Sequence, residues 1–189
     1  MLPKIQQMDA TVNTDNLFMM RALELAQFAA DDGEVPVGAV IVHGGEIVGE
    51  GYNQPISNCD PTAHAEVVAM RQACISLNNY RLTGCELYVT IEPCTMCVGA
   101  MVHARITRVV FGALEPRAGA LQSQLQLMDH GPYNHSIVWE GGVLEAQCSK
   151  MISNFFRQKR DLKSNKQLNR RHVAELPVCF CSIIVRFCG

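Results

Sequence analysis

The sequence predicts an α/β fold built on a mixed sheet of about five strands. Two apolar runs, 35–42 and 47–52, are separated by a pair of glycines, which is typical of an antiparallel hairpin. Two further runs, 87–91 and 106–111, flank a segment with helical spacing, and strands joined by such a crossover pair in parallel. The 189 residues, of which 48% are hydrophobic, suffice for one domain with a sizeable core and an appendage.

The first helix and the strand after it carry the next expectations. Thr14 and Asp15 offer a helix cap, and the apolar residues that follow return at helical intervals. We therefore expect a helix from this point and a flexible segment over 1–13. Pro36 and Gly38 stand at the start of the first strand, where they are either edge and bulge residues or positions that let a backbone approach a ligand closely.

Three more helices are expected in the rest of the chain. One begins near His64, and the next runs from the region of Cys94 to about His103. The last helix follows a short strand at 137–139 and a pair of glycines. The residues expected to face inward are Val67, Val68, Met70, Ala73 and Ile75 on the first of these helices and Leu144, Cys148, Met151, Ile152 and Phe155 on the last.

Charge is divided unevenly along the chain. The net charge is −2, but residues 1–156 hold 8 Lys and Arg against 16 Asp and Glu, whereas residues 157–189 hold 8 against 2. This asymmetry indicates that the basic end, and not the acidic body, meets an anionic partner. The odd count of nine cysteines, without a secretory leader pattern or an apolar run of membrane-spanning length, favours a reducing, cytoplasmic location.

Two short motifs carry the chemistry. Thr62-Ala63-His64-Ala65-Glu66 supplies one imidazole, and Pro93-Cys94-Thr95-Met96-Cys97 supplies two thiolates, which together are ligands that zinc prefers. Three protein ligands leave one position for water, and Glu66 is placed to move protons on and off that water. Each motif is expected to open a helix, so that the side chains converge ahead of the helix start. We expect one zinc ion per chain, with the ligands His64, Cys94 and Cys97.

Either motif alone has an ordinary explanation. A His-x-Glu is usually a plain helix start, and a Cys-x-x-Cys can be a redox pair or a structural metal knuckle. In this order, the two motifs form the known signature of zinc-dependent nucleobase deaminases.

Further segments carry a family resemblance. They are Glu34-Val35-Pro36-Val37-Gly38-Ala39-Val40, Gly51-Tyr52-Asn53, Asn79-Tyr80-Arg81-Leu82, Tyr88-Val89-Thr90-Ile91-Glu92, Arg108-Val109-Val110-Phe111-Gly112-Ala113 and Phe155-Phe156-Arg157. With the two motifs, they make the chain from about Thr14 to Lys166 resemble the bacterial tRNA adenosine deaminases of the TadA type, in the cytidine deaminase-like superfamily. The resemblance implies a three-layer α/β/α fold over 14–166, a homodimer, and conversion of wobble adenosine to inosine in the anticodon loop of tRNA.

The resemblance also implies roles for individual residues. Asn53 and the backbone of Ala65 would hold the base, with Pro36 and Val37 beside it. RNA contacts are expected in the aromatic and basic stretch near the start of the basic end, because rings can stack on splayed bases and cations can contact phosphates. The residues of this stretch are Phe155, Phe156, Arg157, Lys159 and Arg160.

Two parts of the chain depart from the family pattern. Gly119-Ala120-Leu121-Gln122-Ser123 stands where the family usually reads Gly-Ala-x-Gly-Ser, in a stretch over 112–135 without a steady hydrophobic period. His130 and His135 in this stretch are either solvated or contacts to a ligand. A C-terminal extension is expected over 167–189; its apolar end past Glu175 has no family counterpart and is too short to span a bilayer.

Two other functions remain open from the sequence. A deaminase of small nucleobases or nucleosides, of the guanine or cytosine type, would share the zinc motifs but would not need the basic end. A catalytically silent subunit that binds zinc and RNA would not need Glu66 as a proton carrier. None of these functions requires a nucleotide cofactor or a membrane.

Overall fold

A five-stranded mixed sheet forms the centre of the protein. The computed structural model describes residues 9–130 and 133–174. The strands are β1 (Gly38–His43), β2 (Glu46–Tyr52), β3 (Cys85–Ile91), β4 (Arg108–Ala113) and β5 (Val138–Gly141). Their order is β2-β1-β3-β4-β5, with β1 antiparallel to β2 and β3, and with β4 parallel to β3 and β5. The predicted α/β class, the hairpin and the parallel pair around a crossover helix are confirmed.

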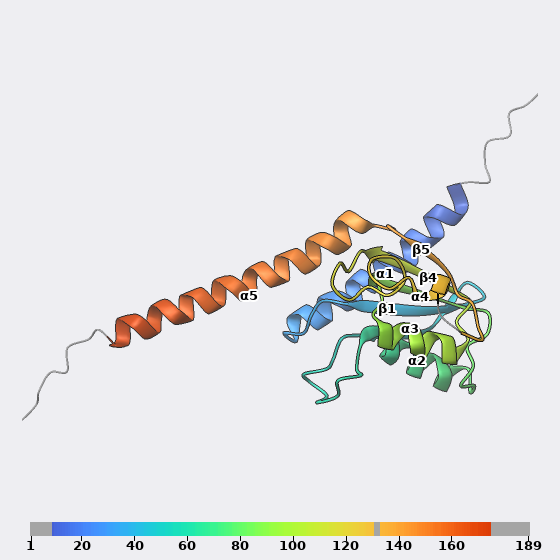
Figure 1. The fold of residues 1–189 in the computed structure, drawn as a ribbon, viewed down its shortest axis with the longest axis horizontal. Helices are drawn as coiled ribbons and strands as arrows, with labels where there is room; N and C mark the ends of the chain where they lie inside the picture. The colour runs from blue at the N-terminus through green and yellow to red at the C-terminus, as the bar shows by residue number, and fades with distance from the viewer. Residues whose placement is uncertain (1–8, 131–132, 175–189) are drawn as a thin grey trace, which may run out of the picture. The chain divides into compact units, whose positions relative to one another are not determined.

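Helices cover both faces of the sheet (Figure 1). They are α1 (Asp9–Asp31), α2 (Ala65–Ser76), α3 (Thr95–Ala104), α4 (Leu127–His130) and α5 (Glu145–Ala174). Helices α2 and α3 pack on one face, and α1 packs on the other together with the first turns of α5. This arrangement gives the three layers that the resemblance implies.

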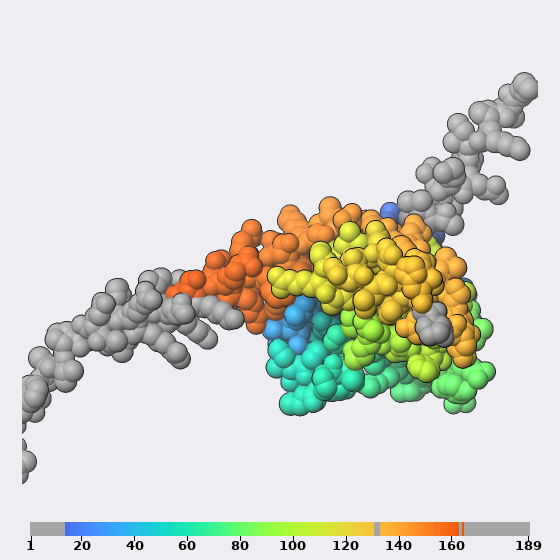
Figure 2. Space-filling view, in the orientation of Figure 1, coloured from blue at the N-terminus to red at the C-terminus, as the bar shows by residue number. Residues whose placement is uncertain are grey.

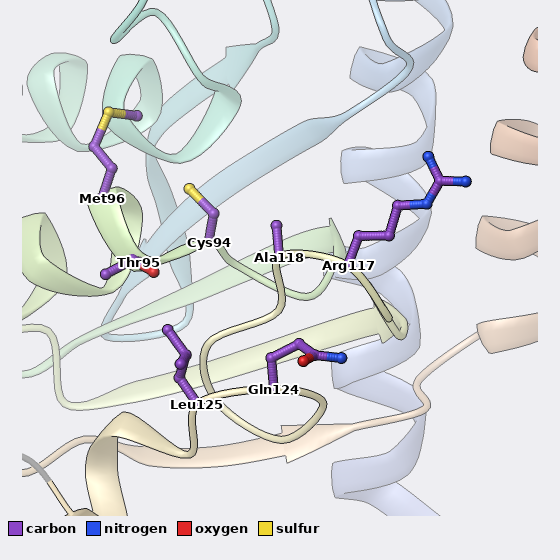
Figure 3. Close-up of a pocket in the computed structure, with 7 residues that line it drawn as sticks. All are labelled: Cys94, Thr95, Met96, Arg117, Ala118, Gln124 and Leu125. Carbon is purple, nitrogen blue, oxygen red and sulfur yellow. The ribbon is translucent and has the colours of Figure 1, made fainter.

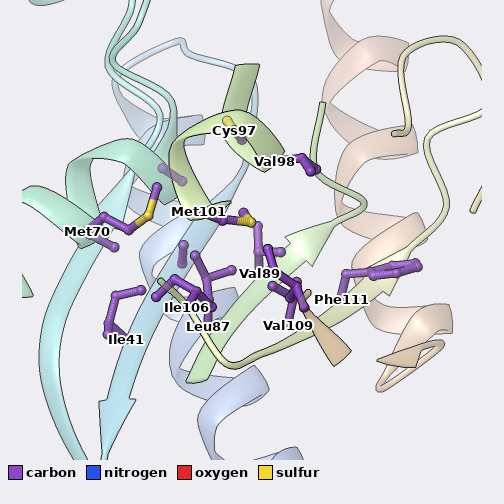
Figure 4. Packing of buried hydrophobic residues seen from close by; sticks show 14 of the residues in the cluster. Ile41, Met70, Leu87, Val89, Cys97, Val98, Met101, Ile106, Val109 and Phe111 are labelled. Carbon is purple, nitrogen blue, oxygen red and sulfur yellow. The ribbon is translucent and has the colours of Figure 1, made fainter. Parts of the chain in front are cut away.

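The face beneath α2 and α3 holds the larger core. Met70 of α2 and Met101 of α3 pack there against Leu87 and Val89 of β3 and Phe111 of β4 (Figure 4). All five side chains are buried. Because such close-packed interiors resist displacement, this core fixes where the starts of α2 and α3 lie relative to the sheet.

Glycines let the helices approach the sheet closely. A Cβ on Gly38 would lie 2.0 Å from the carbonyl oxygen of Ala22 and 2.5 Å from the nitrogen of Ala26, which is closer than these atoms can pack. A Cβ on Gly51 would lie 2.5 Å from the carbonyl oxygen of Ala65, at the start of α2. Gly38 therefore admits a helix, and the bulge that was one of its two expected roles is absent there, because the register shift of β1 lies between Ile41 and Val42.

Helix α1 begins at Asp9 instead of at the predicted cap. The carboxylate of Asp15 accepts hydrogen bonds from the guanidinium of Arg108 at 3.0 and 2.7 Å and from the hydroxyl of Tyr88 at 2.7 Å. These bonds, chiefly that with Arg108, lower the pKa of Asp15 and tie the helix to the sheet instead of capping it. The helix thus includes 9–13, which the sequence assigned to a flexible segment and where no Gly or Pro interrupts it.

Two further expectations need correction. Ile75 is 81% exposed, because it stands two residues after the buried Ala73 and so points to the opposite side of α2. The stretch without a steady period contains the short helix α4. Within it, His135 donates a hydrogen bond from Nε2 to the carbonyl of Ile106 at 2.6 Å, so this ring anchors the chain before β5.

The contacts divide the chain into two units, Met1–Phe155 and Phe156–Gly189. In the first unit, Cys148 and Phe155 of α5 are buried, as the predicted inward face requires. Across the described residues, no helix combines the length and the apolar character needed to cross a membrane. The predictions for the apolar end of the chain concern residues outside the described part.

Candidate active site

His64, Cys94 and Cys97 meet where two helices begin. His64 is the N-cap residue of α2, Cys94 is the N-cap residue of α3, and Cys97 lies in the first turn of α3. Nδ1 of His64 lies 3.8 Å from Sγ of Cys94 and 3.6 Å from Sγ of Cys97, and the two sulfur atoms are 3.7 Å apart. The prediction that each motif opens a helix is confirmed.

This triangle has the dimensions of a tetrahedral zinc site. With Zn–S bonds of about 2.3 Å and Zn–N bonds of about 2.0 Å, two sulfur ligands lie about 3.8 Å apart and a sulfur and a nitrogen about 3.5 Å apart. The measured separations of 3.6, 3.7 and 3.8 Å agree with these values. One zinc ion therefore fits between the three atoms, with the fourth coordination position open. No other group of His, Cys, Asp or Glu side chains in the described part of the chain could hold a metal ion.

The close packing of these groups favours a thiolate at Cys94. The hydrogen bond between the sulfur atoms of Cys94 and Cys97 is the main cause that lowers the pKa of Cys94 to about 4, and the same bond raises the pKa of Cys97. The hydrogen bond with Cys94 also raises the pKa of His64. A divalent cation between the sulfur atoms would replace the shared proton and hold both cysteines as thiolates.

A cavity of about 340 Å³ opens beside the triangle. Its size is in the range of small-ligand sites, and its wall combines apolar side chains with a few polar ones. His64, Cys94, Glu66, Asn53 and Val37 all line it, so the structure brings these predicted site residues together. The other lining residues are Glu34, Val35, Pro55, Ile56, Ile91, Glu92, Glu115 and Ala118.

Glu66 is enclosed in the first turn of α2. It is 3% exposed, and burial raises the pKa of its carboxyl. His64 and Glu66 are separated by two positions, and residues with this spacing do not share a face of a helix. Because His64 precedes the helix with an extended backbone, both side chains nevertheless reach the same cavity.

The other two expected substrate contacts, Ala65 and Pro36, are not among the lining residues of the cavity. The N–H of Ala65 donates to Oδ1 of Asn53 at 2.9 Å, so it orients that side chain and is already occupied. Pro36 is buried beside Val37 but is not among the lining residues. The structure therefore places Asn53 and Val37, but not Pro36, among the residues that line the cavity.

Two buried carboxylates at the cavity were not predicted as site residues. Oε1 of Glu34 accepts the N–H groups of Ile56 and Ser57, both at 2.8 Å. Glu92 holds the loop on the opposite side through the backbone of residues 115–123. The sequence signal that could have identified Glu34 and Glu92 is the position of each acid next to an apolar strand. A charged side chain is rarely buried there unless it has hydrogen-bond partners.

The loop after β4 pairs with Cys94 of the metal triangle through Gly119. The loop also reaches the surface (Figure 2, yellow). Together with the first turn of α3, it encloses a second cavity of about 400 Å³ (Figure 3). Cys94 and Ala118 line both cavities. Gln122, which replaces a family glycine here, does not have positive φ, so this position does not need a glycine. The second cavity is lined by Cys94, Thr95, Met96, Arg117, Ala118, Gln124 and Leu125.

The expected RNA contacts differ in exposure. Phe155 is 9% exposed and Phe156 is 43% exposed. Because the ring of Phe155 is buried, it contributes to the packing of the core. The exposed ring of Phe156 is the one suited to stack on a base. Arg157, Lys159 and Arg160 are exposed on α5.

Comparison with known proteins adds independent findings. Residues 12–113 match the family described as the cytidine and deoxycytidylate deaminase zinc-binding region. Over 150 residues, the chain is 47% identical to the tRNA-specific adenosine deaminase of Haemophilus influenzae, with 79% of this chain and 87% of that protein covered. Over 161 residues, it is 40% identical to the protein of the same name from Bacillus subtilis, with 85% and 98% covered.

Two solved structures of deaminases are similar to this chain in fold and sequence. A structure from studies of A-to-I editing by tRNA:A34 deaminases at the wobble position has a TM-score of 0.70 and 38% identity, covering 71% of this chain and 98% of that chain. The structure of guanine deaminase from Bacillus subtilis has a TM-score of 0.52 and 38% identity, covering 66% of this chain and 82% of that chain.

Proposed function

Because the chain belongs to the cytidine and deoxycytidylate deaminase family, and within it to the tRNA-specific adenosine deaminases, we propose that it hydrolyses wobble adenosine in tRNA to inosine and ammonia. The observation that carries the proposal is the triangle of His64, Cys94 and Cys97 with Glu66 in the adjoining cavity. This arrangement supports zinc-dependent hydrolysis, and the 47% identity to a tRNA-specific enzyme supports the substrate.

Each residue of the site has a proposed task. Zinc held by His64, Cys94 and Cys97 would supply a Lewis acid that lowers the pKa of water toward neutral values. Glu66 would accept a proton from the attacking water and pass it to N1 of adenine, which makes C6 electrophilic. The same carboxyl would then take the second proton of the water from the new hydroxyl at C6 and deliver it to the departing amine, so that adenosine and water become inosine and ammonia.

Asn53 and Val37 would hold the base while these protons move. Since Oδ1 of Asn53 accepts the N–H of Ala65, the Nδ2 group is oriented to donate to an acceptor nitrogen of the purine. Val37 and Ile91 add apolar wall to the same cavity. A base held in this way has already lost its translational and rotational freedom on binding. The entropic cost of bringing it to Glu66 is therefore not part of the barrier of the chemical step.

The target base must leave its stack to enter the cavity, and extrusion from a loop is easier than from a duplex. We therefore propose the anticodon loop as the region that the protein contacts. A homodimer and a cytoplasmic location are parts of the same proposal. The side chains of Ile75 and Tyr80 are 81% and 69% exposed, and these exposed apolar groups near the end of α2 support a protein contact surface there.

The proposal is tested by incubating tRNA with the purified protein and sequencing it for inosine. We expect inosine at the wobble adenosine and release of ammonia in equal amount. Free guanine and cytosine are tested in parallel, because the chain is also 38% identical to a guanine deaminase over 66% of its length. Ammonia from a free base without inosine in tRNA would contradict the proposal and favour a small-molecule deaminase.

Neutralising three cations of α5 should weaken tRNA binding. We expect a variant with Arg157→Ala, Lys159→Ala and Arg160→Ala to bind tRNA more weakly, because the acidic body repels RNA and each phosphate contact contributes about one unit to the salt slope. Alanine keeps the helix propensity high. The measurement is tRNA affinity over a series of salt concentrations, with the exposed Gln158→Ala as the control. Equal affinities and equal slopes would exclude these cations as RNA contacts.

A further inference from the structure

Glu92 is a buried carboxylate that has no part in the chemistry assigned above. It lies between the end of β3 and the start of α3 and is 2% exposed. Its Oε1 accepts the backbone N–H groups of Leu121, Gln122 and Ser123 at 3.2, 2.7 and 2.8 Å. Its Oε2 accepts the N–H of Glu115 at 3.1 Å and the hydroxyl of Ser123. A carboxylate offers about four acceptor sites, so these bonds leave neither oxygen available to a substrate.

The chain over 115–123 folds around this carboxylate. It contains no helix and no strand apart from an isolated β-bridge between Gly119 and Cys94. Gly119 passes so close that a Cβ on it would lie 2.3 Å from Oε2 of Glu92. Hydrogen bonds to an ionised acceptor are roughly twice as strong as those between neutral groups. The conformation of this segment therefore depends on Glu92 more than on any one of its backbone bonds.

The same segment forms one wall of the candidate active site. Glu115 and Ala118 line the cavity that also contains His64 and Glu66. Arg117 and Ala118 line the neighbouring cavity, where Figure 3 shows Ala118 next to Cys94. A shift of the backbone at Ala118 would change the shape of both cavities.

We propose that Glu92 is a positioning residue for substrate, because its carboxylate holds 115–123 as the wall against which the base and its neighbouring nucleotides bind. This inference rests on the proposed function, because it assigns to Glu92 a role in binding the substrate of that same cavity. Glu92 acts through backbone amides, so side chains as different as Leu121 and Gln122 are compatible with it. Loss of this bonding changes substrate binding and leaves proton transfer at Glu66 intact, so KM responds more than kcat.

The test compares two variants with a control. Glu92→Gln keeps the size of the side chain but turns an NH2 group toward N–H donors, and we expect KM for tRNA to rise at least about tenfold with kcat within about threefold of the unmodified protein. Ser123→Ala removes a single bond and should raise KM about threefold. The double variant should have the KM of Glu92→Gln, because both changes act on one contact. Glu46→Gln, exposed on β2, should change neither constant.

Hydrogen exchange separates this inference from the proposed function, since it requires no substrate. Amides of 115–123 should exchange at least about tenfold faster in Glu92→Gln, while those of α2 keep their protection and the zinc content stays at one per chain. If inosine is never formed but exchange accelerates in this way, the proposed function is refuted and the role of Glu92 in holding the segment is supported.

Three outcomes overturn the inference. The first is unchanged KM and unchanged exchange in both variants. The second is a fall in kcat with unchanged KM, because Glu92 would then act on the chemistry. The third is loss of zinc in Ser123→Ala, because the segment would then serve the metal centre. If Glu92→Gln does not fold, the KM and exchange of Ser123→Ala decide by the same criteria.

Discussion

Replacement of Glu66 by glutamine is expected to remove most of the turnover while zinc stays bound at about one ion per chain. Glutamine has nearly the same shape but cannot accept the proton of the attacking water or deliver one to the leaving amine. The rate should fall by at least the roughly 10²- to 10⁴-fold that a general acid–base group contributes. The measurement is single-turnover deamination of tRNA together with metal analysis of the same sample.

Glu46→Gln is the matched control for this prediction. It makes the same chemical change on an exposed position of β2, so both the rate and the zinc content should stay at their normal values. A nearly normal rate in Glu66→Gln would show that another group carries the protons. Loss of zinc from Glu66→Gln would show that this carboxylate supports the metal centre instead of the chemistry.

Replacement of Cys97 by alanine is expected to remove zinc and destabilise the fold. The side chain is fully buried, and its sulfur lies 3.6 Å from His64 and 3.7 Å from Cys94, so its loss leaves two ligands. A ligand that binds only the folded state adds about 4 kcal/mol to the free energy of unfolding at a thousand times its dissociation constant. We expect a loss of this order, measured by urea unfolding with and without a chelator.

Cys85→Ala is the matched control, because Cys85 is equally buried but lies at the start of β3. It should lose only the packing of one sulfur and keep its zinc. A chelator should destabilise the unmodified protein and Cys85→Ala, and it should have no effect on Cys97→Ala. Equal destabilisation of the two variants, with zinc retained in both, would refute Cys97 as a ligand.

The sequence was sufficient to predict the features that depend on local spacing. The hairpin, the crossover helix and the two helix starts at His64 and Cys94 follow from short patterns, and the structure has them where they were predicted. The convergence of His64 with Cys94 and Cys97 was expected from ligand chemistry, because zinc requires those atoms to lie within one coordination sphere.

The features that depend on distant partners could not be predicted in this way. Glu92 binds residues 23 to 31 positions further along the chain, and no periodicity indicates such contacts. Asp15 looked like a helix cap because its pairing with Arg108, 93 positions away, cannot be read from its neighbours. Phe155 was expected both to face inward and to contact RNA, and the sequence could not decide between the two roles; the structure decides, since Phe155 is 9% exposed and Phe156 is 43% exposed.

The two helix starts restrict how this protein could be stabilised by engineering. Serine, threonine, aspartate or asparagine at an N-cap typically contributes about 1 kcal/mol. Neither His64 nor Cys94 makes a side-chain capping bond, although each occupies that position. A substitution chosen to improve either cap would therefore remove a side chain of the proposed zinc site for a small gain in helix stability. A programme to raise the melting temperature has to leave these two positions unchanged and look for its gains elsewhere in the chain.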